Sequence, residues 1–231
     1  MSRFSIIVGT MLVGTVIGGA VSAQTITAFD LSSVVPGNQQ YGGTIGVAFT
    51  VNSLINVSAL GAFDAAIPNT TTAHTLVGTI VTSIYDSNTQ QVVPGLTQTF
   101  TAASPGTLQG GYLFKPTAGI SLLPGSYVIT FTALNTGGGL DQDGNTNVGP
   151  ATPPTYNEAN NTITINKTQL QYSGVTGSQT YPNLGSPGQL DASTFKFNAV
   201  LTPEPGTVSL FGSLAVMGTS VLLRRRRRVQ K

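Results

Sequence analysis

The sequence predicts an all-β fold, a single β-sandwich or jelly-roll-like domain that spans residues 24–201. The clearest indication is the segment 44–51, where apolar side chains alternate strictly with small or polar ones. Its apolar face consists of Ile45, Val47, Phe49 and Val51. Noisier alternation occurs in segments 76–85, 127–134, 162–172 and 193–201, and residues 24–201 show no convincing helical period. We therefore expect about eight to ten short strands with polar outer faces.

Turn-forming residues separate the expected strands. They are the tripeptide Asp86-Ser87-Asn88 and the dipeptides Pro94-Gly95, Pro105-Gly106 and Pro124-Gly125. Two longer segments, 135–161 and 173–190, are too long for ordinary connections between strands. Long loops of this kind are usually functional or mobile, so we expect both segments on the surface.

Residues 1–23 are typical of a secretory signal peptide. Arg3 supplies a short positive region, residues 6–17 an apolar stretch, and Val21-Ser22-Ala23 a cleavage site of small residues. Cleavage after Ala23 leaves Gln24 as the first residue. The alternative is an uncleaved membrane helix, which the short, glycine-interrupted apolar stretch disfavours.

Residues 202–231 predict a membrane-inserted tail in three parts. Pro203-Glu204-Pro205 comes first, an apolar stretch at 208–223 follows, and an arginine cluster comes last. That cluster consists of Arg224, Arg225, Arg226, Arg227 and Arg228. As a helix the apolar stretch would span ~24 Å of the ~30 Å hydrocarbon core, and snorkelling of the first arginine covers the difference. Since the arginines resist translocation, we expect them in the cytoplasm and the preceding domain outside.

This order of motif, helix and arginine cluster resembles the PEP-CTERM sorting signal. The resemblance implies recognition by an exosortase, a membrane transpeptidase-like enzyme, with processing near Pro203-Glu204-Pro205. It also implies a Gram-negative envelope, a precursor tethered to the inner membrane, and a link to exopolysaccharide and biofilm. The two prolines favour an extended, unpaired segment that such an enzyme can grip. The alternative is a plain tail anchor with a chance Pro-Glu-Pro sequence.

Segments inside the domain carry a second resemblance. Phe49-Thr50-Val51-Asn52, the segment 57–64, His74 and the segment 123–129 resemble β-sandwich ectodomains that often precede PEP-CTERM tails. The resemblance covers much of residues 42–134 and supports the same fold class.

Charge and composition narrow the function classes. The formal net charge is +2, but seven of the ten lysines and arginines lie in the two terminal segments. The expected exported part, Glu204 included, has three lysines against eight acidic residues, so its charge argues against nucleic-acid binding. Because the chain has no cysteine, disulfides, thiolate metal sites and cysteine nucleophiles are excluded.

One segment has the character of a calcium loop. Asp141, Asp143 and Asn145 place oxygen ligands at alternate positions, which suits calcium. The segment departs from the calcium-loop pattern, because glycine is at the fourth position and the twelfth is Thr152. A plain polar turn is the favoured interpretation, and we expect no cofactor unless calcium binds here.

The candidate catalytic residues do not form a credible set, so we do not expect an enzyme. His74 is the only histidine and follows a Thr-rich turn, where a solvated or capping role is commoner than catalysis. Five tyrosines could line a glycan groove, but tyrosine is also a normal strand residue, and packing in the core or on a strand face is the favoured interpretation. These tyrosines are Tyr41, Tyr112, Tyr156, Tyr172 and Tyr181.

The sequence thus favours an exported, non-enzymatic surface or matrix protein with a structural or adhesive role. Its expected partners are an exosortase, the inner membrane, and exopolysaccharide or other glycans, with no nucleic acid. The alternative is a carbohydrate-binding module that works with or without the assistance of calcium. A third hypothesis is an envelope hydrolase that depends on His74.

Overall fold

The computed structural model describes residues 24–30, 42–63, 76, 78–134, 155–175, 177–187 and 192–199. Every regular element within these residues is a β-strand, which confirms the all-β prediction. The expected signal peptide at 1–23 and sorting tail at 202–231 lie outside the described residues. In the part of the chain that is described, no helix has the length and apolar character needed to cross a membrane.

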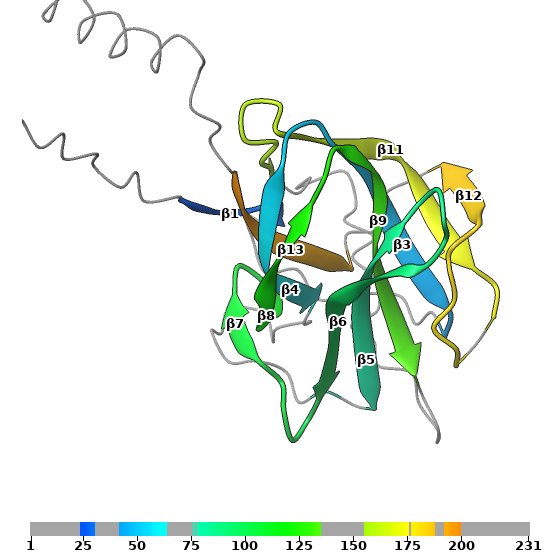
Figure 1. Cartoon of the computed structure of the whole chain (residues 1–231). Coiled ribbons are helices and arrows are strands. Elements are labelled where there is room, and N and C mark those ends of the chain that lie inside the picture. Colours follow the sequence, from blue (N-terminus) through cyan, green and yellow to red (C-terminus); the bar gives the residue numbers. More distant parts are fainter. Residues whose placement is uncertain are drawn as a thin grey trace, which may run out of the picture.

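One antiparallel sheet has five strands in the order β1-β13-β4-β8-β7 (Figure 1). Its strands are β1 (Thr25–Thr27), β13 (Ser193–Ala199), β4 (Ile55–Phe63), β8 (Tyr112–Leu122) and β7 (Thr107–Gln109). The first and last strands of the described chain are neighbours in this sheet, because Thr25 pairs with Asn198 and Thr27 with Lys196.

The second sheet has six strands in the order β12-β11-β3-β9-β5-β6 and is also antiparallel. Its strands are β12 (Leu184–Pro187), β11 (Ile163–Ser173), β3 (Thr44–Val51), β9 (Gly125–Leu134), β5 (Thr79–Asp86) and β6 (Val92–Thr101). A short ribbon completes the fold, formed by β2 (Phe29–Asp30) and β10 (Thr155–Tyr156). The described residues thus hold thirteen strands, more than the eight to ten expected.

The two sheets pack against each other around a common apolar core, in a sandwich-like arrangement. The rings of Phe49 in β3 and Phe195 in β13 lie 4.7 Å apart across the interface between the sheets. The alternation predicted for 44–51 is confirmed, since its four apolar residues are at most 4% exposed and belong to the core. Burial of each such side chain stabilises the fold by about 1.5–3 kcal/mol.

Three of the four predicted turns are confirmed and one is wrong. Asp86 begins the turn between β5 and β6, where its Oδ1 accepts the backbone N–H groups of Asn88 at 2.8 Å and Thr89 at 2.9 Å. Pro105-Gly106 and Pro124-Gly125 lie between strands or at the start of one. Pro94-Gly95 lies instead inside β6, at a register shift opposite β5, and Gly95 adopts the left-handed φ of 82° that such a bulge favours.

The segment predicted as a long loop at 173–190 is partly a strand and partly a cover for the second sheet. Residues 184–187 form β12, which pairs with β11. Residues 177–182, hereafter the strap, run over the outer face of the sheet. Gln179 Nε2 donates to Ser83 Oγ at 2.6 Å, and the N–H of Thr180 donates to Thr44 Oγ1 at 3.2 Å. Four hydroxyl-bearing residues of this outer face are fully buried, namely Thr44, Ser83, Thr130 and Thr132.

Candidate functional site

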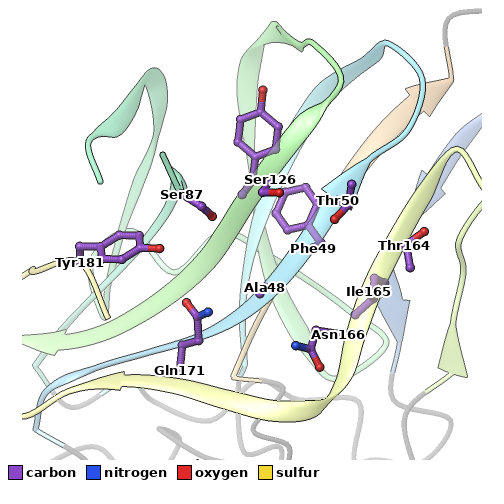
Figure 2. A pocket seen from close by; sticks show the side chains of 11 residues that line it. Ala48, Phe49, Thr50, Ser87, Ser126, Thr164, Ile165, Asn166, Gln171 and Tyr181 are labelled. Carbon is purple, nitrogen blue, oxygen red and sulfur yellow. The ribbon is translucent and has the colours of Figure 1, made fainter. Parts of the chain in front are cut away.

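Beyond the strap, the outer face of the six-stranded sheet contains a hollow of about 310 Å³ (Figure 2). Strand β3 forms its floor at Ala48, and strands β9 and β11 supply its walls. Eight of the described lining residues have hydroxyl or amide side chains: Thr50, Ser87, Ser126, Tyr127, Thr164, Asn166, Gln171 and Tyr181. We call this region the β3 hollow.

The β3 hollow exists because β11 loses its regular pairing with β3 for four residues. Ile165 pairs with Phe49 and Leu170 with Val47, so residues 166–169 of β11 face the single residue Ala48. A bulge of this size pushes β11 away from β3 and leaves the outer face uncovered at that point. Figure 2 shows the side chains of Asn166 and Gln171 at two separate points along this strand.

The hollow is deepest over β3 because the side chains on the outer face of this strand are small. Gly46 and Ala48 alternate with the core residues of this strand. A Cβ atom at position 46 would lie 2.7 Å from Cγ1 of Val128 and 2.9 Å from the backbone oxygen of Ile129. Glycine at this position therefore permits the close contact between β3 and β9 beside the hollow.

A carboxylate holds the start of the bulge. Glu158 Oε1 accepts the backbone N–H of Ile165 at 3.0 Å and lies 3.1 Å from Nζ of Lys167. The backbone N–H of Ile165, and to a smaller extent Lys167, keep the pKa of Glu158 below its ordinary value, while desolvation opposes this shift. Lys167 also lies over the ring of Tyr156, 5.3 Å from its centroid. Glu158 therefore links residues before and inside the bulge.

The turn before β11 stores backbone strain next to the hollow. Ala159, Asn160 and Asn161 have φ angles of 48°, 53° and 66°. These angles lie in the left-handed region, which alanine tolerates less well than asparagine does. Asn52 stabilises this turn, because its Nδ2 donates to the backbone oxygen of Asn161 at 2.9 Å and to Thr164 Oγ1 at 2.8 Å. Strain that surrounding contacts maintain is typical of functional sites.

The amide of Gln171 is incompletely satisfied. Its Oε1 is buried and has no hydrogen-bond partner among the described residues. A buried acceptor without a donor lowers stability by about 1–3 kcal/mol, so the side chain gains from any donor that reaches it. Gln171 pairs with Gly46, and this register places it on the outer face of the sheet, beside the hollow.

Among the described residues that line the β3 hollow, none has a charged side chain. Lys167 follows Asn166 in sequence but is held by Glu158 and Tyr156. Tyr127 stays neutral over a wide pH range, because burial, and secondarily the nearby Asp86, raise the pKa of its hydroxyl. The hollow can therefore exchange hydrogen bonds with a ligand, but its described lining holds no carboxylate, histidine or lysine for proton transfer near neutral pH.

An aromatic ring lies at one margin of the polar lining. This is the ring of Tyr181, in the strap, which lies on one side of Ala48, while Thr164 lies on the other side (Figure 2). The Tyr181 ring packs edge-on against Tyr85, with 5.7 Å between centroids and 69° between planes. Of the five tyrosines that suggested a glycan groove, Tyr41 lies outside the described residues. Among the other four, Tyr181 alone lines this hollow, while Tyr112 is fully buried in the core.

The site residues expected from the sequence lie outside the described residues. These are Ala23, the motif Pro203-Glu204-Pro205, the arginines 224–228, the calcium candidates Asp141, Asp143 and Asn145, and His74. Among the residues that are described, no cluster of three or more His, Cys, Asp or Glu side chains could hold a metal ion.

The sequence reasoning missed the β3 hollow. Its local signal is the run of small outer residues Gly46 and Ala48 in an otherwise regular strand. The bulge in β11 and the partner strands on each side depend on contacts that are distant in sequence.

Fold and site together define an all-β, sandwich-like domain with a neutral, hydrogen-bonding hollow on one sheet face. No protein-family model and no curated protein sequence matches this chain.

Proposed function

We propose that this chain is an exported surface or extracellular-matrix protein with a non-enzymatic, structural or adhesive role. In this proposal, residues 1–23 direct export and an exosortase recognises Pro203-Glu204-Pro205. The domain is a β-sandwich, delivered as a precursor tethered to the inner membrane by the apolar stretch 208–223, with arginines 224–228 on the cytoplasmic side.

The observation that carries the proposal is the pairing of β1 with β13. Thr25 lies two positions after the expected cleavage site, and its partner Asn198 lies five positions before Pro203. The two proposed membrane segments are therefore attached to neighbouring strands. A precursor can hold both segments in one bilayer while the domain between them is folded, because the start of β1 and the end of β13 lie side by side in one sheet (Figure 1).

The chemistry of the β3 hollow supports a binding role in preference to a catalytic one. Its hydroxyl and amide side chains can donate and accept hydrogen bonds, whereas general acid–base catalysis near neutral pH most often uses a histidine, a carboxylate or a lysine, none of which is among the described lining residues. This hollow also favours the second candidate function, a carbohydrate-binding module. The calcium-assisted form of that function depends on Asp141, Asp143 and Asn145.

The sorting proposal is tested in the full chain, expressed in cells with an exosortase. Replacing Pro203-Glu204-Pro205 by three alanines should make the intact precursor accumulate in the membrane fraction, as followed by immunoblot after fractionation. Pro94→Ala is the matched control, since Pro94 is an exposed proline outside the motif. Unchanged maturation of the triple-alanine chain would contradict processing at this motif.

A further inference from the structure

We propose that the β3 hollow is a binding site for a neutral saccharide. This inference deepens the proposed function, because it names the ligand class through which an adhesive domain contacts a glycan matrix, and it depends on that function for its biological setting. It stands on three features of the hollow: its neutral polar lining, the unsatisfied amide of Gln171, and its place on a sheet face.

The lining matches the hydrogen-bonding pattern of sugar hydroxyls. A sugar hydroxyl donates one hydrogen bond and accepts others, and so do the hydroxyls of Thr50, Ser87 and Ser126, while the amides of Asn166 and Gln171 each offer both roles. These groups come from β3, β9, β11 and the β5–β6 turn, so they surround the floor from several directions. Convergent polar groups of this kind orient a small ligand.

The side chain of Gln171 brings to the site a buried acceptor that has no hydrogen-bond donor among the described residues. Because its Oε1 has no partner among the described residues, rotation of the amide toward the hollow exposes an acceptor without breaking a hydrogen bond made by that oxygen. A ligand hydroxyl can then donate to it, which removes the desolvation penalty of an unpaired buried acceptor.

The uncharged side chains of the described lining residues favour neutral over acidic saccharides. Uronic acids and sulfated sugars would place an anion in the hollow, where no described lining residue is cationic and the neighbouring Lys167 is engaged by Glu158. Burial of an unpaired charge is unfavourable, so the hollow disfavours such ligands.

The position of the hollow disfavours an extended peptide. Peptides add to sheets by pairing with the exposed backbone of an edge strand. Strand β3 is not an edge, because it pairs with β9 on one side and with β11 on the other. The ligand of this site therefore meets side chains on a sheet face, and Tyr181 offers a half-buried aromatic ring at its margin.

The experiment measures binding of three hexasaccharides by calorimetry to the purified full-length protein in detergent. Two probes are neutral, cellohexaose and mannohexaose, and the third is the hexasaccharide of galacturonic acid. We expect at least one neutral probe to bind and the acidic probe to bind at least about tenfold more weakly.

Two variants locate the binding site. Ala48→Leu fills the floor, and we expect it to weaken binding of the neutral probe by at least about tenfold. Ala118→Leu is the matched control, since Ala118 is an exposed alanine on the five-stranded sheet, and should bind as the wild type does. If Ala48→Leu does not fold, as judged by circular dichroism, Thr50→Val serves instead, with an expected loss of about threefold to tenfold and Thr107→Val as its control.

Each outcome of the binding experiment supports or overturns the saccharide-binding proposal, whatever the sorting experiment shows. Loss of neutral-probe binding in the hollow variants, with normal binding in the controls, supports it. Unchanged binding in Ala48→Leu, binding of the acidic probe alone, or no binding of either neutral probe overturns it. The proposed function has its own readout, maturation of the Pro203-Glu204-Pro205 variant, so either can fail while the other stands.

Discussion

Glu158 shows how a single side chain can position a wall of the β3 hollow. It accepts the backbone N–H of Ile165, the last residue of β11 that pairs regularly before the bulge, and it also holds Lys167 inside the bulge. Neither partner is adjacent to Glu158 in sequence. The carboxylate therefore couples the strained turn that precedes β11 to the irregular part of that strand.

This coupling predicts a specific pH dependence. The pKa of Glu158 is lower in the folded chain, mainly through the N–H of Ile165. Its stabilising contribution is therefore complete above the ordinary glutamate range, near about 4.3, and is lost as the pH falls through the lowered pKa. We expect Glu158→Gln to lower the free energy of unfolding at neutral pH by about 1 kcal/mol, a value limited by solvent screening of the pair.

Urea denaturation of wild type and Glu158→Gln from pH 7 downward measures this effect. The difference in the free energy of unfolding between the two proteins should shrink as the pH falls through the pKa of Glu158, because the wild-type carboxyl then becomes neutral too. Glutamine keeps an oxygen that can accept the Ile165 N–H, so the variant isolates the charge. A difference that does not change with pH would contradict this role of Glu158.

At the scale of elements, the strap determines how much of the six-stranded sheet is open to a ligand. Thr44 Oγ1 lies 2.8 Å from Thr132 Oγ1 and also contacts the strap backbone at Ser178 and Thr180. Buried hydroxyls thus pair with each other and with the strap, and the outer face is polar without being exposed. The region around Ala48, beyond the strap, is open as the β3 hollow.

We expect the strap to open as a local unit. Gln179→Ala removes the 2.6 Å hydrogen bond to Ser83, whose hydroxyl keeps Thr97 as a partner at 3.0 Å. A local loss of about 1 kcal/mol should speed deuterium uptake of residues 177–182 about fivefold, with little change in β3 and β9. Mass spectrometry of peptic fragments measures this uptake.

Gln98→Ala is the matched control for the strap. Gln98 Nε2 donates to the backbone oxygen of Pro116, away from residues 177–182, so its loss should leave uptake by the strap unchanged. Equal acceleration across the whole sheet in Gln179→Ala would show that the strap does not open separately.

At the scale of the whole molecule, aromatic contacts join the two sheets into one cooperative unit. Phe195 of β13 is fully buried and contacts both Phe49 of the other sheet and Phe197 of its own, with centroids 4.7 Å and 5.7 Å apart. Since β13 also pairs with β1 and β4, this ring connects the strand next to the proposed tether with the core beneath the hollow.

Truncation of this ring should destabilise the entire domain. Phe195→Ala is expected to lower the free energy of unfolding by about 3–5 kcal/mol, through lost burial and the cavity that remains. Urea denaturation followed by tyrosine fluorescence and by circular dichroism should give one coincident transition at lower denaturant. The control is Leu123→Ala, which alters a side chain that is 67% exposed and should change stability by no more than about 0.5 kcal/mol. Two separate transitions in Phe195→Ala would contradict a single cooperative unit.

Local sequence patterns predicted the strands because the period of two is a property of neighbouring residues. The strict alternation at 44–51 became β3 with the expected core face, and Asp86 began a turn because its carboxylate reaches the backbone two and three residues later. The same local reasoning failed at Pro94-Gly95. That pair resembles a turn in isolation, yet the partner strand β5 makes it a bulge within β6.

By itself, the sequence determined the all-β class and the core face of β3. The export proposal also starts from the sequence alone, because residues 1–23 and 202–231 lie outside the described residues. Only the tertiary structure decided that β1 lies beside β13, that residues 177–182 cover the outer sheet face, and that β11 separates from β3 at Ala48. The physical reason is range. Alternation and turn chemistry act over a few residues, whereas the β3 hollow is assembled from strands whose partners are selected by packing and hydrogen bonds between distant parts of the chain.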